Sequence, residues 1–185
     1  MKLDNPACSS SENRPIYHEK QRKQLCLLHT LNNLFQRREF SQQELDEICE
    51  RLDDRRYFNP HRSWIGLGNY DANILLIALQ SRDFTGRYFD KRLPAYRIKH
   101  KLIRAYIFNI PSPPFTLLPF FKGRHWFAVL SINNVYYNLD SKLDAPIKIT
   151  EDFNTFIDKL LEAGNELLLV VEPENENTCV INSDE

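Results

Sequence analysis

The sequence predicts an α+β fold, with helices in the first half of the chain and a mostly antiparallel sheet after them. Apolar residues recur at spacings of three and four over 27–35 and 45–52, and the run 72–80 is rich in Leu and Ile. Such stripes are typical of helices that turn one face to a core. From Phe84 onward, short aromatic and β-branched runs favour strands instead. Helices followed by strands indicate the α+β class.

Length and charge place the chain among single-domain globular proteins. It has 185 residues, 42% of them hydrophobic, and a net charge of -1, so we expect one core that buries about 70% of the unfolded chain's surface. Balanced charge argues against nucleic acid as a partner. We find neither an apolar run of membrane-spanning length nor a secretory signal. We therefore expect a cytoplasmic monomer, with the nucleus as an alternative compartment.

The two ends of the chain differ in composition from the middle. Residues 1–15 are mostly polar, and the tail after Pro173 carries Glu and Asp with no Lys or Arg. Segments of this kind bury too little apolar surface to fold. We predict a disordered lead over 1–15, a folded domain over 16–172 and a disordered acidic tail over 173–185.

The cysteines do not suggest a disulfide framework. Cys8, Cys26, Cys49 and Cys179 form no C-x-x-C pair, and Cys49 lies on the apolar stripe of a predicted helix. This arrangement is unlike that of a small secreted domain, so reduced thiols are expected.

Cys26 stands at the first turn of the predicted helix over 27–35. Backbone N–H groups without partners and the positive end of the helix dipole stabilise a thiolate at this place. The same groups, with a side-chain amide from Gln21 or Gln24, would hold the oxyanion of an acyl-transfer intermediate. Spacing alone does not choose between the two glutamines. The alternative is a small apolar residue packed at a helix start.

Start and stop signals support the other helices. Ser41 followed by Glu44 predicts a capping box for the second helix, and Asp71 predicts a cap for the third. Thr150 is the expected N-cap of a late helix that ends at Gly164. The run 166–171 then resembles a buried strand.

An alternating pair of runs around Asn133-Asn134 predicts a hairpin with a two-residue turn. Ile132 then pairs with Val135, and counting back places Phe127 opposite Asp140. His125 shares the face of Phe127, so Asp140 is its diagonal neighbour, about 7–8 Å away between Cα atoms. Two polar side chains close such a gap with a hydrogen bond. A slip of one residue would separate them.

Several short motifs follow one another along the chain, namely Ile16-Tyr17-His18-Glu19-Lys20-Gln21, Cys26-Leu27-Leu28-His29, Leu31-Asn32-Asn33, Asn59-Pro60-His61-Arg62-Ser63, Gly68-Asn69-Tyr70-Asp71, His125-Trp126 and Tyr137-Asn138-Leu139-Asp140-Ser141. Together they resemble the Josephin family of cysteine peptidases, over about residues 16–171 and in the family's order. The chain is most similar to the short stand-alone Josephin-domain proteins.

The resemblance implies a papain-like fold and a deubiquitinating thiol protease that acts at the C-terminal glycine of ubiquitin. It places the nucleophile on Cys26, the base on His125, the orienting group on Asp140 and the oxyanion amide on Gln21. Ubiquitin and ubiquitinated proteins are the implied partners, and no metal or cofactor is implied. The resemblance also implies a helical arm over roughly 41–63 that contacts ubiquitin. Leu27 stands where many relatives have alanine.

Two alternatives accompany this interpretation. His29 follows Cys26 by three residues and is a rival base, but no acid lies near it in sequence, so we expect a packed histidine. A zinc site using both residues lacks a second ligand pair. The other functional alternative is a ubiquitin-binding module with weak or gated catalytic activity.

Overall fold

The computed structural model describes residues 15–52, 70–112 and 123–181. Residues 1–14 of the lead predicted over 1–15 lie outside these ranges, and the predicted arm over 41–63 is described only as far as Leu52. The α-helices within the described ranges are α1 (Cys26–Phe35), α2 (Gln42–Leu52), α3 (Ala72–Gln80) and α4 (Phe153–Glu162). The strands are β1 (Thr85–Tyr88), β2 (Ala105–Pro111), β3 (Arg124–Ile132), β4 (Val135–Asn138), β5 (Ile147–Lys148) and β6 (Glu166–Val171).

The described strands form one six-stranded sheet in the order β1-β6-β2-β3-β4-β5. Every neighbouring pair is antiparallel, which confirms the predicted α+β class with an antiparallel sheet. The last strand, β6, lies between β1 and β2 and so joins the end of the chain to the middle of the sheet.

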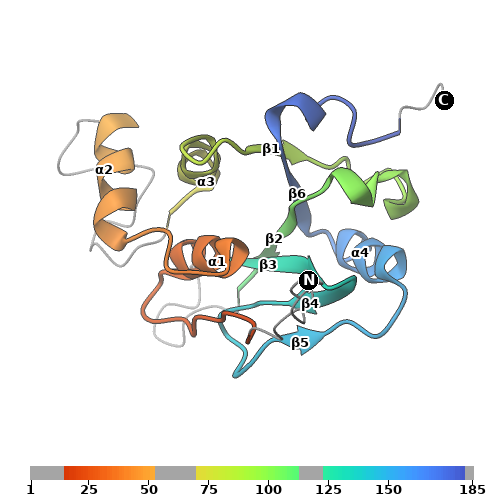
Figure 1. Ribbon diagram of the computed structural model, residues 1–185, viewed down its shortest axis with the longest axis horizontal. Coiled ribbons are helices and arrows are strands. Elements are labelled where there is room, and N and C mark those ends of the chain that lie inside the picture. The colour runs from red at the N-terminus through yellow and green to blue at the C-terminus, as the bar shows by residue number, and fades with distance from the viewer. Residues whose placement is uncertain (1–14, 53–69, 113–122, 182–185) are drawn as a thin grey trace, which may run out of the picture.

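Helices cover both faces of the sheet, with α1, α2 and α3 on one side and α4 on the other (Figure 1). Because successive side chains of a strand point to opposite faces, the strands contribute residues to a core on each face of the sheet. Ile107 and Ala128 belong to the cluster that includes α1, α2 and α3, whereas Phe108 and Val129 pack with α4. The sheet is therefore the middle layer of three. Among the described helices, none is long and apolar enough to cross a membrane.

The first two helices form where the apolar stripes predict them. Every residue of α1 from Cys26 to Leu34 is buried. In α2, the hydroxyl of Ser41 accepts a hydrogen bond from the Glu44 N–H at 3.2 Å, as an N-cap does. Leu52, predicted on the buried face, is instead 41% exposed because it is the last residue of its helix.

Asp71 caps α3 as predicted, since its carboxylate accepts from the N–H groups of Asn73 and Ile74 at 2.9 and 3.2 Å. The predicted cap of α4 is wrong. Asp152 caps that helix instead of Thr150, by accepting from the Thr155 N–H at 2.9 Å. Asp lies among the strongest N-cap residues, and Thr is weaker.

The hairpin has the predicted register. Ile132 pairs with Val135, and the turn residues Asn133 and Asn134 have φ angles of 52° and 62°. Both angles lie in the left-handed region that a two-residue type I′ turn requires, and asparagine tolerates it better than most residues do. The turn therefore fixes which side chains of β3 face those that follow β4.

The predicted disordered tail is wrong for residues 173–181. Cys179 and Val180 are buried, 0% and 5% exposed, in the cluster that contains α4. The Lys99 N–H donates to the Cys179 carbonyl at 2.8 Å, and Val180 bridges to Ile98. Two apolar residues thus anchor a segment whose overall composition is acidic. Residues 182–185 lie outside the described ranges.

Candidate active site

Cys26 is the first residue of α1 and is 5% exposed. The N-cap residue, Leu25, makes no side-chain hydrogen bond to the helix. The N–H groups of the first turn are thus not capped by that side chain, and they point toward the end of the helix at which Cys26 lies. This is the backbone arrangement that an oxyanion site requires.

His125 and Asp140 lie at the ends of the hairpin strands and contact each other. The Nε2 atom of His125 is 2.6 Å from Asp140 Oδ1, which confirms the hydrogen bond predicted from register. His125 is 2% exposed, and the Asp140 side chain is 14% exposed. Because Nε2 faces the carboxylate, Nδ1 is the ring nitrogen left for Cys26, which contributes to raising the pKa of His125.

Opposing effects set the protonation of this pair. Burial alone would lower the pKa of His125, but its hydrogen bonds with Asp140 and Cys26 outweigh burial and raise that pKa above 6.5. Burial likewise acts to raise the pKa of Asp140, but the His125 ring and the Lys142 N–H hold it below 3.8. Both shifts favour an imidazolium beside a carboxylate.

The segment that carries Asp140 is tied to the N-terminal part of the chain through its backbone carbonyls. Asn33 Nδ2 donates to the Leu139 carbonyl at 2.9 Å. His18 Nε2 donates to the Asp140 carbonyl at 3.0 Å. The Gln21 N–H donates to the Ser141 carbonyl at 2.7 Å. These three contacts hold the orienting carboxylate against the part of the chain that precedes and includes α1.

Gln21 is therefore next to the segment that carries Asp140. Its side-chain amide donates to the Lys23 carbonyl at 3.0 Å, and its side-chain oxygen accepts from the Ser141 hydroxyl at 3.4 Å. An NH₂ group carries two hydrogens, so the bond to Lys23 leaves one hydrogen for another acceptor.

His29 has an acid partner that the sequence analysis missed. Its Nδ1 is 2.6 Å from Glu19 Oε2, and its Nε2 accepts from the Arg22 N–H at 3.1 Å. The expectation that His29 has no acid nearby is wrong. Glu19 lies ten residues earlier, before the helix begins, and the fold brings its carboxylate to the ring. Both ring nitrogens are engaged, so His29 is packed, as expected, and directs neither nitrogen at Cys26.

Buried polar residues in α1 were the available signal for these contacts. Asn32 and Asn33 are 2% and 0% exposed in an otherwise apolar helix. A buried amide requires partners, and here Glu19 supplies them to both: its carboxylate to Asn32 and its N–H to the Asn33 oxygen at 2.6 Å. Sequence alone did not show which residues those partners are.

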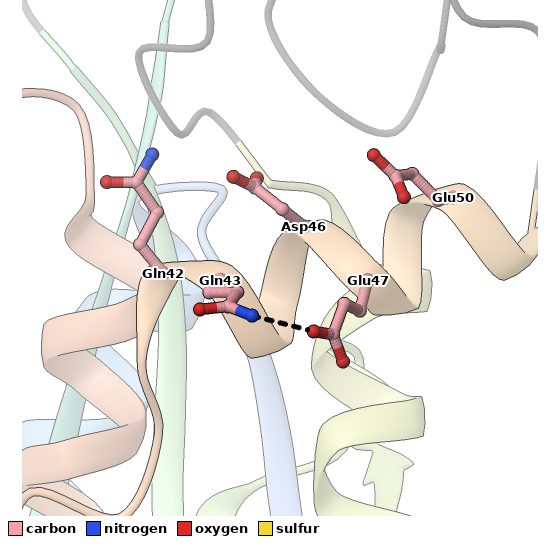
Figure 2. Close-up of a pocket in the computed structure, with 5 residues that line it drawn as sticks. All are labelled: Gln42, Gln43, Asp46, Glu47 and Glu50. Carbon is pink, nitrogen blue, oxygen red and sulfur yellow. Dashed lines mark hydrogen bonds between the residues drawn. The ribbon is translucent and has the colours of Figure 1, made fainter.

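A separate hollow along α2 offers no comparable chemistry. It is lined by amide and carboxylate side chains from that single helix (Figure 2), namely Gln42, Gln43, Asp46, Glu47 and Glu50. It contains neither a nucleophile nor an imidazole. In the part of the chain that the structure describes, no group of three or more His, Cys, Asp or Glu residues is arranged to hold a metal ion.

A cysteine at the start of a buried helix, set against a His–Asp pair on an antiparallel sheet, defines the class of papain-like cysteine peptidases. Within that class, the model of the Josephin family matches residues 21–171. The chain belongs to the Josephin family, and the resemblance noted from its motifs is confirmed.

Individual relatives agree with the family match. A Josephin-like protein of Drosophila melanogaster is 43% identical, over 87% of this chain and 76% of its own length. Josephin-2 of Homo sapiens is 42% identical, over 87% of this chain and 88% of its own. Ataxin-3 of Homo sapiens is 27% identical, over 84% of this chain but only 45% of its own length.

Proposed function

We propose that this chain is a deubiquitinating thiol protease, which hydrolyses the amide or isopeptide bond at the C-terminal glycine of ubiquitin. One observation carries the chemical part of the proposal: Nε2 of His125 lies 2.6 Å from the Asp140 carboxylate, which leaves Nδ1 of the ring for Cys26 at the start of α1. Membership of the Josephin family supports ubiquitin as the substrate.

The first half of the proposed reaction forms a thioester. The Cys26 thiolate attacks the carbonyl carbon of the ubiquitin glycine, and the oxyanion is held by the Cys26 N–H and the Gln21 amide. The imidazolium of His125, oriented by Asp140, donates its proton to the leaving lysine amine as the carbon–nitrogen bond breaks. The raised pKa of His125 favours the protonated ring that this step needs.

The second half releases ubiquitin. Neutral His125 takes a proton from water, and the resulting hydroxide attacks the thioester carbonyl. The carbon–sulfur bond then breaks, Cys26 regains its thiolate beside the imidazolium, and the new carboxylic acid of ubiquitin loses its proton to solvent. His125 gives the proton to the amine and takes the proton from water.

A ubiquitin-binding module with gated activity is the second candidate, and one observation favours it. Cys26 is 5% exposed and Leu27 is 0% exposed, so the sulfur is largely covered in this conformation. A substrate carbonyl must approach to about 3–3.5 Å before attack. In this candidate, the cleft opens too rarely for steady turnover.

Release of aminomethylcoumarin from the C-terminus of ubiquitin tests the proposal. We expect the wild-type protein to release it, Cys26→Ala to abolish release, and His125→Ala to reduce kcat by about 10²–10⁴-fold. His29→Ala is the internal comparison, because His29 is the histidine of α1, the helix that begins at Cys26. Loss of turnover with His29→Ala but not with His125→Ala would contradict the assigned base.

A further inference from the structure

Glu19, in the loop before α1, and His29, in α1, form a second carboxylate–imidazole pair, for which the reaction above has no use. Resting on the proposed function, we propose that His29, held by Glu19, is a positioning residue that fixes the loop carrying the oxyanion amide of Gln21. It acts through the backbone of Arg22, which is the next residue after Gln21.

The Glu19 carboxylate accepts hydrogen bonds from three residues. It accepts from His29 Nδ1 at 2.6 Å, from Asn32 Nδ2 at 3.1 and 3.2 Å, and from the hydroxyl of Tyr17. Burial acts to raise the pKa of Glu19, but these donors outweigh burial and lower it. The pKa of Tyr17 is raised to about 12, first by burial and then by its bond to Glu19. Glu19 is thus an anion that accepts from several elements at once.

That anion fixes the tautomer of His29. The Arg22 N–H can only donate, so His29 Nε2, 3.1 Å away, must be the ring nitrogen without a hydrogen. The hydrogen of the neutral ring therefore lies on Nδ1, where Glu19 accepts it. Without the carboxylate, the ring would lose the group that holds its acceptor nitrogen toward the loop.

The loop itself needs such a restraint. Lys23 has a φ of 55°, in the left-handed region, and the Leu25 N–H turns back to the Arg22 carbonyl at 3.4 Å. A non-glycine residue in this region is strained and persists only where its surroundings impose it. The side-chain amide of Gln21 bonds to the carbonyl of this same strained residue. A shift of Arg22 would thus move the oxyanion donor as well.

Two near-isosteric variants separate the roles of the ring nitrogens. His29→Gln places an amide oxygen near the position of Nε2 and keeps an acceptor for the Arg22 N–H. His29→Asn places its amide near Nδ1, so it keeps a donor for Glu19 but loses the acceptor. We expect His29→Asn to lower kcat for coumarin release by about 10-fold to 100-fold with KM within about threefold, and His29→Gln to retain most of the rate.

A double variant tests whether the effect passes through Gln21. If His29 positions that amide, Gln21→Ala combined with His29→Asn is no slower than Gln21→Ala alone, because the donor is already gone. Alkylation of Cys26 by iodoacetamide forms no oxyanion, so its rate should stay within about twofold in all these variants. The proposal would be overturned if the losses in kcat from Gln21→Ala and His29→Asn multiplied in the double variant. It would also be overturned if His29→Asn and His29→Gln had equal effects. Slower alkylation would instead assign His29 to the nucleophile or to folding.

Hydrogen exchange of the Arg22 amide tests the contact without using activity. We expect faster exchange in His29→Asn than in His29→Gln, and equal exchange in the two would overturn the positioning contact. If the wild-type protein releases no coumarin while the exchange rates differ as expected, the proposed function fails and the loop contact stands. The two failures are therefore distinguishable.

Discussion

Asp140 supplies His125 with a charge as well as a hydrogen bond. Asp140→Asn keeps an acceptor oxygen and removes the charge, so we expect the pKa of His125 to fall toward its ordinary value. Because the protonated ring must donate to the leaving amine, the alkaline limb of the pH profile of kcat should move to lower pH. Asp140→Ala also loses orientation of the ring, which should cost on the order of 10²-fold in kcat.

Asp144→Asn is the matched control for this profile. Asp144 also pairs with a cation, Lys20, but its side chain is 95% exposed. Its removal should leave the alkaline limb in place. An alkaline limb that stays fixed in Asp140→Asn, or moves to higher pH, would contradict the assigned pair.

The same pair links stability to pH. The pKa of His125 is raised from 6.5, so its contribution is complete below that pH and is lost as pH rises through the folded value. The pKa of Asp140 is lowered from 3.8, so its contribution is complete above that pH and is lost as pH falls. The stability difference between wild type and Asp140→Asn should therefore be largest between these two values.

At the scale of elements, the segment over 139–141 joins the two halves of the site. Asn33 is 0% exposed, donates to the Leu139 carbonyl and accepts from the Glu19 N–H. Its removal leaves the buried Leu139 carbonyl and the partly buried Glu19 N–H unpaired, at about 1–3 kcal/mol for a fully buried group and less for the other. We expect Asn33→Ala to lower the free energy of unfolding by about 2–4 kcal/mol in urea titrations, and to slow coumarin release because Asp140 loses a support.

Asn73→Ala is the control, because Asn73 is an exposed asparagine on α3 whose side chain donates to Asp71 at 3.3 Å. Exposed substitutions of this kind change stability by about 0.5 kcal/mol or less. Equal losses in the two variants would show that the contacts of Asn33 with the Leu139 and Glu19 backbones add nothing.

The hairpin was predictable because its information is local. The turn type follows from Asn133 and Asn134, and the period of a strand then determines which residues face each other. The contact between His125 and Asp140 needed no other input. The contact between Glu19 and His29 is the opposite case. One residue lies in a loop and the other in a helix, and no sequence periodicity relates them.

At the scale of the whole molecule, the segment after β6 packs against the core that contains α4. Truncation after Glu172 would remove Val180 and Cys179, and would expose the surface they cover on Ile98. We expect a loss of about 2–4 kcal/mol in the free energy of unfolding, mostly from the lost burial of these side chains.

Truncation after Ile181 is the control, because it retains every described contact of this segment. It should unfold at the same urea concentration as the full chain. An unchanged midpoint after truncation at Glu172 would contradict the packing seen here.

Composition explains why this segment was mispredicted. Its acidic residues outnumber the apolar ones, so an average over 173–185 predicts disorder. The fold instead depends on two side chains and on main-chain bonds to Arg97 and Lys99, far away in sequence. The overall class and antiparallel sheet were predictable from periodicity, whereas contacts between distant segments were not.

Covalent trapping tests most directly whether the cysteine, histidine and carboxylate form a working site. The full chain is incubated with ubiquitin that bears an electrophile at its C-terminus, and the adduct is mapped by mass spectrometry. We predict one ubiquitin per chain, attached to Cys26 and absent from Cys26→Ala, with the buried thiols of Cys49 and Cys179 unmodified. Ubiquitin binding without any adduct, or an adduct at another cysteine, would contradict the account.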